Sequence, residues 1–128
     1  RYKKIFEPAK ILIEKKKYEE VFKISKLVIS TYPKTSFYES FLSGPSILLT
    51  NLDHFKINKE FDELHGILKR NKMLFEDSFE ASSFVLSIWD NVNDWWSSNS
   101  TQEALKIFKS YLGYEKKNKI KIWANLIK

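Results

Sequence analysis

Five polar side chains between positions 30 and 36 have the chemistry of an anion site. Four carry hydroxyl groups and one carries a positive charge: Ser30, Thr31, Lys34, Thr35 and Ser36. Hydroxyls and the free N–H groups of a first helical turn donate hydrogen bonds to phosphate oxygens. The helix dipole adds about 0.3–1 kcal/mol of stabilisation for a negative charge at that end. A strand that leads into a helix here predicts a site for a phosphorylated ligand, at the carboxyl end of a parallel strand.

Two short apolar strands and the helix between them position these side chains. The run Leu27–Ile29 has no polar alternation, which is typical of a strand covered on both faces. A helix is predicted over Ser36–Ser43, and Gly44-Pro45 ends it. A second buried strand is predicted over Ser46–Thr50.

The start of this helix has two interpretations that the sequence leaves open. Ser36 and Glu39 fit the S-x-x-E capping box, in which each side chain bonds the backbone N–H of the other residue. Thr35 also fits the N-cap position, and a cap is favoured over a phosphate contact for this residue. Lys34 fits a solvated surface lysine better than a phosphate ligand. For Ser36, a capping role and a ligand contact are compatible.

The rest of the chain alternates helices with further short strands. Apolar residues at helical spacing predict the helices, and compact apolar runs predict the strands. The predicted segments are a strand at Ala9–Ile13, helices at Tyr18–Ile24 and Lys59–Arg70 (capped by Asn58), a strand at Met73–Phe75, and helices at Asp77–Ser97 and from Ser100 to Leu112. Start signals for the last two helices are Asp77 with Glu80 and Ser100 with Glu103.

This order of elements predicts an α/β fold, a partial Rossmann-like unit with few short parallel strands and long C-terminal helices. The connections are too long for hairpins, and no Asn-Gly or Asp-Gly pair is present. Two or three strands are too few for an independent doubly wound sheet, and the chain begins with Arg1 rather than Met. We therefore expect residues 1–113 to be the C-terminal domain of a longer chain. Residues 114–128 are expected to form a basic, helical tail.

Composition and charge narrow the class of protein. Of the 128 residues, 43% are hydrophobic, which excludes a disordered tail, and none is cysteine, which excludes thiolate metal sites. The net charge is +5 over residues 1–26, −5 over 27–104 and +6 over 105–128. An acidic centre argues against a nucleic-acid binder. The basic ends are best interpreted as solvated surfaces, and weak contact with an anionic membrane surface is the alternative. We therefore expect a cytoplasmic or membrane-peripheral protein.

Two stretches carry a resemblance to known families. The first runs through LVIST, YPKTSF, Glu39, Gly44-Pro45 and SILLT, and this order resembles the C-terminal, nucleotide-binding half of GT-B glycosyltransferases. The second stretch, Ser87–Gly113, resembles the end of a transferase family of bacterial surface-carbohydrate synthesis. The matching residues there are Trp95-Trp96, the polar break Ser97–Ser100, and then Ala104, Phe108 and Tyr111. Leu112-Gly113 stands where that family commonly has alanine.

The resemblance implies a glycosyltransferase-like enzyme that uses a nucleotide-sugar to build cell-surface polysaccharide. It implies a glycan acceptor as second substrate and no metal or other cofactor. Ser30, Thr31, Lys34, Thr35 and Ser36 would hold the diphosphate, whose charge grows during transfer. Glu39 would accept hydrogen bonds from the ribose hydroxyls. The catalytic base would come from a missing N-terminal domain, so this chain alone is expected to bind donor weakly and to transfer nothing.

The two histidines and the tryptophan pair are expected to have structural roles. His54 and His65 are the two histidines of the chain. Without a cluster of His, Asp or Glu at ligand spacing, we expect no catalytic or metal role for either. Trp95-Trp96 fit a core better than a platform for a sugar. The second functional hypothesis is a non-catalytic α-helical interaction module whose apparent strands are loops, and parallel pairing near Val28 and Leu48 distinguishes the two.

Overall fold

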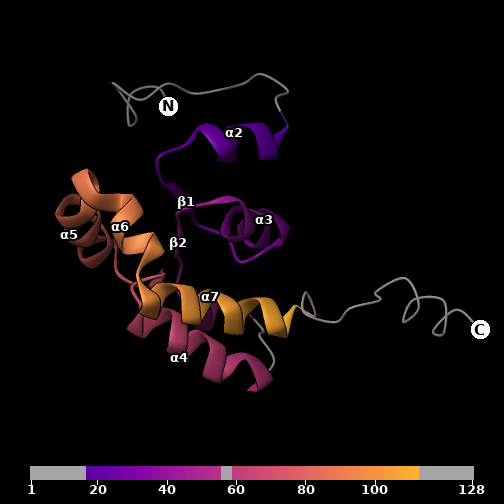
Figure 1. Cartoon of the computed structure of the whole chain (residues 1–128). Coiled ribbons are helices and arrows are strands. Elements are labelled where there is room, and N and C mark those ends of the chain that lie inside the picture. Colours follow the sequence, from indigo (N-terminus) through magenta and orange to yellow (C-terminus); the bar gives the residue numbers. More distant parts are fainter. Residues whose placement is uncertain (1–16, 56–58, 113–128) are drawn as a thin grey trace, which may run out of the picture.

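A three-stranded parallel sheet forms the centre of the molecule. The computed structural model describes residues 17–55 and 59–112 (Figure 1). The strands lie in the order β1 (Val28–Ser30), β2 (Ser46–Leu49), β3 (Leu74–Phe75), and all are parallel. In the register, Val28 pairs with Ser46, and Leu48 pairs with both Ser30 and Leu74. The predicted α/β class with few short parallel strands is confirmed. The all-helical alternative is wrong, because the apparent strands hydrogen-bond into one sheet.

Helices cover both faces of this sheet. On one face, α3 (Thr35–Ser43) connects β1 to β2, and α4 (Asp62–Arg70) connects β2 to β3 after a 3-10 turn at Lys59–Phe61. On the same face, α7 (Asn99–Tyr111) packs against α4. On the other face lies α5 (Ser78–Ile88), which follows β3 (Figure 1). A shorter helix, α2 (Tyr18–Ile24), packs against α3. Cover on both faces explains why buried and exposed residues do not alternate along β2 and β3.

Successive strand residues point to opposite faces and divide the core in two. Leu48 and Leu74 belong to the larger cluster, beneath α3, α4 and α7. Their neighbours Ile47 and Phe75 belong to the smaller cluster, with Ala81 of α5. Trp95 packs against both clusters, so it joins the two sides of the sheet.

Phe108 is the centre of the larger cluster. Its side chain is fully buried. Its ring centroid lies 5.7 Å from that of Phe37, 5.8 Å from that of Tyr38 and 5.1 Å from that of Phe41. The three partners belong to α3, so this aromatic cluster fixes α3 against α7.

The predicted single helix over Asp77–Ser97 is wrong. Its start signal is confirmed, because Asp77 Oδ1 accepts a hydrogen bond from the Glu80 N–H at 2.8 Å. The helix then stops at Ile88, and a 3-10 turn at Trp89–Asn91 leads into α6 (Val92–Ser97). An unbroken helix of about 30 Å would extend well past strands of two to four residues, since a strand rises only about 3.3 Å per residue. The break turns Trp95 and Trp96 into the core.

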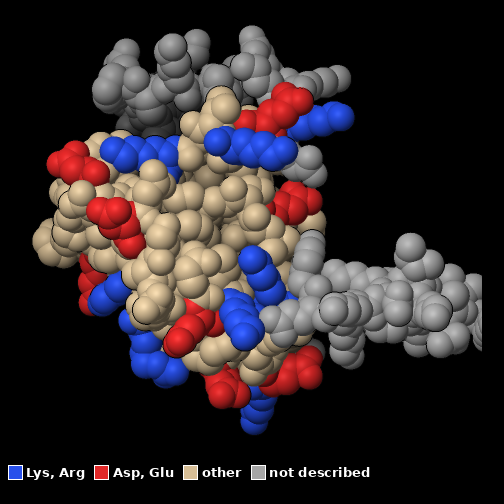
Figure 2. Space-filling model, in the orientation of Figure 1, with Lys and Arg blue, Asp and Glu red and all other residues tan. Residues whose placement is uncertain are grey.

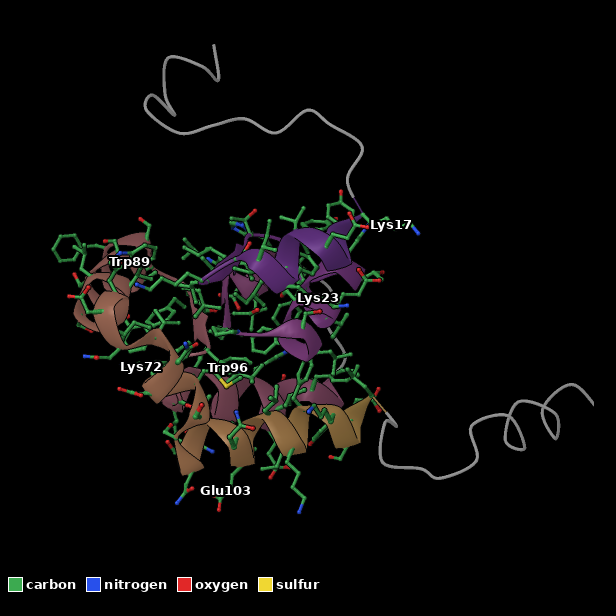
Figure 3. All side chains as sticks on the ribbon, turned by 45° about the horizontal axis from the view of Figure 1, so that its top comes forward. Lys17, Lys23, Lys72, Trp89, Trp96 and Glu103 are labelled. Carbon is green, nitrogen blue, oxygen red and sulfur yellow. The ribbon has the colours of Figure 1, made fainter. Side chains whose placement is uncertain are left out.

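The two tryptophans therefore have the predicted core role. Trp96 packs against Phe41 with ring centroids 6.0 Å apart, and Trp95 packs against Phe84 at 5.4 Å. Figure 3 shows Trp96 directed inward, whereas Trp89 lies at the outer end of the α5–α6 region and Glu103 projects from α7 into solvent. On the face seen in Figure 2, charged side chains of both signs surround an area of uncharged residues.

The capping box predicted for Ser100 and Glu103 is also wrong. The helix α7 begins one residue earlier, at Asn99, with Ser98 in the N-cap position. Ser98 Oγ bonds the Trp95 carbonyl oxygen at 2.7 Å and Thr101 Oγ1 at 3.0 Å. Thr101 is buried, so this hydroxyl pair holds the α6–α7 corner.

Other predicted helices agree closely with the structure. The segment Tyr18–Ile24 is helical over the predicted range, and Leu64 and Leu68 form the buried stripe of α4. The predicted strand Ala9–Ile13, the cap Asn58, Gly113 and the tail 114–128 lie outside the described residues.

Truncation of Phe108 tests the aromatic cluster. Phe108→Ala should lower the free energy of unfolding by about 3–5 kcal/mol, because it removes a fully buried ring and leaves a cavity. Its neighbour Ile107 is 36% exposed, and Ile107→Ala should cost about 1 kcal/mol or less. Urea denaturation of both variants measures the difference. Equal losses would show that the cluster does not fix α3 to α7.

Candidate functional site

A groove at the carboxyl end of β1 brings together three of the six predicted site residues. Ser30, Thr31 and Ser36 line this groove, which has a volume of about 230 Å³. We call it the hydroxyl groove. The other lining residues come from α2, from β1 and from the turn after β1: Tyr18, Phe22, Val28, Ile29 and Tyr32. Three hydroxyl groups thus lie in one hollow where β1 ends and α3 begins.

The helix α3 begins without a side-chain cap. Its N-cap residue is Lys34, and no side-chain cap hydrogen bond forms there. The predicted capping box of Ser36 and Glu39 is therefore wrong, and so is the alternative cap by Thr35. The chain enters the helix earlier because the Phe37 N–H already bonds the Lys34 carbonyl oxygen at 2.9 Å. Ser36 is the second residue of the helix, and its side chain lines the groove instead of capping the helix N-terminus.

Lys34 lies beside the groove rather than in its lining. Its Nζ is 4.9 Å from the ring centroid of Tyr32, which is a distance typical of a cation–π contact. Tyr32 lines the groove and is half exposed. The contact places a positive charge at the rim of the hydroxyl groove.

Thr35 and Glu39 are not among the lining residues. Thr35 is the exposed first residue of α3, and Glu39 is partly buried one turn further along. Residues three apart share a helix face, so Glu39 lies on the same side of α3 as Ser36. The six predicted residues therefore form an inner set of three hydroxyls and an outer set of three neighbours.

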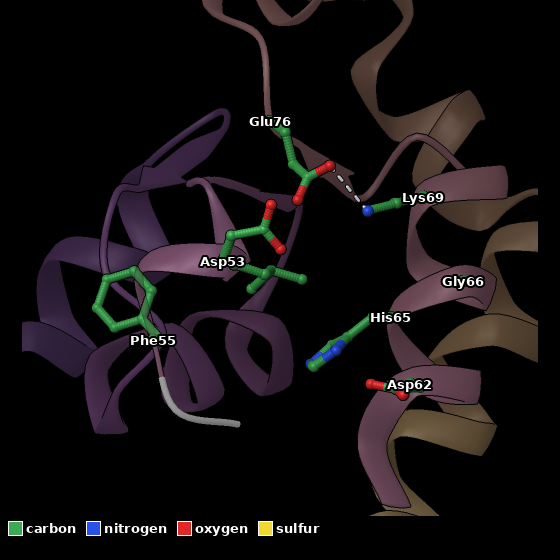
Figure 4. A pocket seen from close by; sticks show the side chains of 8 residues that line it. Asp53, Phe55, Asp62, His65, Gly66, Lys69 and Glu76 are labelled. Atoms are coloured by element: carbon green, nitrogen blue, oxygen red, sulfur yellow. Dashed lines mark hydrogen bonds and ion pairs between the residues drawn. The ribbon is translucent and has the colours of Figure 1, made fainter. Parts of the chain in front are cut away.

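A second, larger hollow lies at the carboxyl ends of β2 and β3. It has a volume of about 510 Å³, and we call it the His65 pocket. Figure 4 shows His65 and Lys69 reaching in from α4, opposite Asp53 and Phe55 from the segment after β2. The remaining lining residues are Leu52, Asp62, Gly66 and Glu76, of which Glu76 follows β3 directly.

One ion pair neutralises part of the His65 pocket. Lys69 Nζ lies 2.9 Å from Glu76 Oε2, and both side chains are partly exposed. The hydrogen bond from Lys69 is the main reason that the pKa of Glu76 is lowered. Asp53 and Asp62 take part in no ion pair among the described residues. The lining residues that the structure describes therefore carry an excess of negative charge.

Burial lowers the pKa of His65 below the ordinary value of 6.5. The charge of Lys69 acts in the same direction, while Asp62 and Glu76 oppose it. Desolvation is the largest of these effects, so the imidazole is neutral at neutral pH. A neutral imidazole has one nitrogen that donates a hydrogen bond and one that accepts.

An aromatic contact separates the two hollows. The rings of Tyr32, from the hydroxyl groove, and Phe55, from the His65 pocket, meet edge to face with centroids 5.2 Å apart. The hydroxyl groove and the His65 pocket are therefore neighbours along one edge of the sheet, the edge at which open parallel sheets bind ligands.

The sequence did not predict the His65 pocket. Its residues come from three separate segments between positions 52 and 76, and no functional role was expected for His65. One signal was available: Asp53 and Glu76 follow closely after the second and third predicted strands. These residues lie at strand ends in the same way as Ser30 and Thr31.

The structure shows no metal-binding group and no membrane-spanning helix in the part of the chain that it describes. No three His, Cys, Asp or Glu side chains gather there as metal ligands would. No described helix is both long enough and apolar enough to cross a bilayer.

Comparison with known proteins identifies the class. The sequence profile of the LIC12162 family transferase matches residues 2–127, almost the whole chain. The chain therefore belongs to this transferase family, and the expectation of a transferase is confirmed at the level of that class. No curated protein and no solved structure matches the chain.

The lowered pKa of His65 predicts a pH-dependent stability. The unfolded chain takes up the proton near pH 6.5, whereas the folded chain takes it up only at lower pH. The contribution of His65 to the free energy of unfolding is therefore complete above pH 6.5. It is lost as the pH falls from there through the pKa that His65 has in the folded chain. His65→Gln should reduce the difference in unfolding free energy between about pH 7.5 and about pH 5.5.

Urea denaturation at the two pH values measures this difference. The control variant is His54→Gln, because His54 is exposed and does not line the pocket. The same pH dependence in the wild type and in His65→Gln would contradict the prediction.

Proposed function

We propose that this transferase is glycosyltransferase-like and that the hydroxyl groove holds the diphosphate of a nucleotide-sugar donor. The observation that carries the proposal is the convergence of Ser30, Thr31 and Ser36 on one groove at the start of α3. Hydroxyl donors that are already oriented stabilise the charge that develops on a leaving diphosphate. The groove of about 230 Å³ is smaller than the roughly 300–1,000 Å³ that encloses a drug-sized ligand, so it suits the phosphates alone.

Residues at the rim of the groove complete the proposed donor site. Lys34 supplies a positive charge beside Tyr32. The first-turn N–H groups of α3, Thr35 included, direct the positive end of the helix dipole at the phosphates. Glu39 accepts hydrogen bonds from the ribose hydroxyls, since a carboxylate next to the phosphates would repel them.

The proposal extends to partners and to the cellular role. The resemblance to GT-B enzymes supports a nucleotide-sugar donor, a glycan acceptor and a further, N-terminal domain that supplies the catalytic base. The second stretch that resembles a known family, Ser87–Gly113, supports a role in surface-polysaccharide synthesis, in the cytoplasm or at the membrane periphery. Helix dipoles and hydroxyls take the place of a metal cofactor in this scheme. The mixture of charge signs in Figure 2 gives no support to a nucleic-acid partner.

Replacement of one hydroxyl tests the diphosphate site. Ser36→Ala should weaken the binding of UDP by the 128-residue chain about tenfold, because one hydrogen bond to a charged phosphate is lost. NMR titration of the labelled chain measures the affinity, and the backbone amides of residues 30–32 and 34–37 should shift. Ser100 is a matched control, since it is likewise the second residue of a helix but lies outside the groove. Equal affinities in Ser36→Ala and Ser100→Ala would refute the diphosphate site.

Glu39 should distinguish the nucleoside from the phosphates. Glu39→Ala should weaken UDP binding, because the ribose loses its acceptor, and should slightly strengthen the binding of inorganic diphosphate, because a negative charge is removed. Titration with both compounds separates the effects, and a thermal melt confirms that the variant stays folded. Unchanged UDP affinity together with a large drop in melting temperature would show that Glu39 is only a structural residue.

A further inference from the structure

The diphosphate site proposed above does not use the His65 pocket, whose size and position suit a ligand. Its volume of about 510 Å³ falls within the range of pockets that enclose small ligands. It opens at the carboxyl ends of β2 and β3, next to the strand end that forms the hydroxyl groove. A ligand that extends past the Tyr32–Phe55 contact would enter it.

The charges of the pocket oppose a phosphate. Asp53 and Asp62 take part in no ion pair among the described residues, and Glu76 already holds Lys69 at 2.9 Å. A phosphate would meet two carboxylates, with the one positive charge among the lining residues already engaged. The pocket therefore selects against the group that the hydroxyl groove attracts.

The same side chains suit a ring that carries several hydroxyl groups. Carboxylate oxygens of Asp53 and Asp62 accept hydrogen bonds from hydroxyls, and neutral His65 both donates and accepts. Phe55, which comes from the same segment as Asp53 and lies across the pocket from His65, offers an aromatic surface against which the C–H face of a sugar ring can pack. A pocket with hydrogen-bond acceptors on both walls and an aromatic ring beside one of them fits a sugar.

We propose that the His65 pocket binds a phosphate-free sugar ring, with His65 as an acceptor of one of its hydroxyl hydrogens. The proposal deepens the proposed function, on which it rests. The ring belongs either to the nucleotide-sugar donor or to the acceptor, and both sources present the same chemistry. His65 is faced by Asp62 and Lys69 of its own helix, by Asp53 after β2 and by Glu76 after β3.

The test is an NMR titration of the 128-residue chain with glucose, UDP-glucose, UDP and inorganic phosphate. Glucose at about 50 mM, a concentration suited to millimolar affinity, should shift the amides of Asp53, Phe55, His65 and Gly66. Shifts at these residues with UDP-glucose, and not with UDP, would assign the ring to the donor. Inorganic phosphate should leave them unchanged.

The pKa of His65 gives a second readout. A sugar that donates to the neutral imidazole stabilises the neutral form, so glucose should lower the pKa of His65 further. A pKa of His65 that stays constant or rises with glucose would contradict the assignment.

Two variants separate binding from folding. His65→Gln should weaken glucose binding about 3- to 10-fold, the effect of one hydrogen bond. Gly66 lines the pocket from within α4, and a Cβ at this position would meet only the flexible Arg70 side chain, at 3.4 Å. Gly66→Leu should therefore fill the pocket and abolish glucose binding, while the better helix propensity of Leu maintains stability.

Failure of this proposal is distinguishable from failure of the donor site. Ser36→Ala should leave glucose binding unchanged, and His65→Gln should leave the binding of inorganic diphosphate unchanged. Absence of pocket shifts with both glucose and UDP-glucose would overturn the sugar site and leave the diphosphate site standing. Shifts with inorganic phosphate, or normal glucose binding by Gly66→Leu, would also overturn it.

Discussion

The packing of Phe108 against α3 is the constraint on which the site depends. Phe37 and Phe41 lie one turn apart on α3, with ring centroids 4.5 Å from each other, and both contact Phe108. Because these rings are buried, the rotation of α3 about its axis is fixed. Ser36 immediately precedes Phe37, so its side chain lies about 100° around the helix from that ring, to one side of the core. That direction is toward the end of β1, where Ser30 and Thr31 lie.

Local patterns predicted the elements well and their ends poorly. The strand at Leu74–Phe75 and the buried stripe of α4 follow from hydrophobic spacing, which tertiary packing reinforces. Both misassigned capping boxes have one cause. The S-x-x-E pattern at Ser36 and at Ser100 describes a favourable local bond, but the N-cap residue of each helix lies two positions earlier in the structure. Burial of several aromatic rings contributes more free energy than one cap of about 1 kcal/mol.

The hydroxyl groove was predictable because its residues are close in sequence. Ser30, Thr31 and Ser36 lie within seven positions, so a strand–turn–helix prediction is enough to bring them together. The His65 pocket required the register of two strand pairs and the rotation of α4, which no local pattern contains. Asp53 and Glu76 become neighbours only because β2 and β3 are adjacent and parallel. The lowered pKa of His65 likewise depends on burial that tertiary packing creates.

The two hollows differ in charge because different strands end at each. Hydroxyls and the Lys34 ammonium group surround the end of β1, whereas carboxylates follow β2 and β3. Lys69 already neutralises Glu76, so an incoming anion would have to share the Lys69 ammonium group with that carboxylate. For the proposed nucleotide-sugar, only one direction across the Tyr32–Phe55 contact is therefore favourable, with the phosphates at β1 and the neutral ring beside His65. In the proposed complex, the charge pattern of the sheet edge orients the donor before any catalytic group acts.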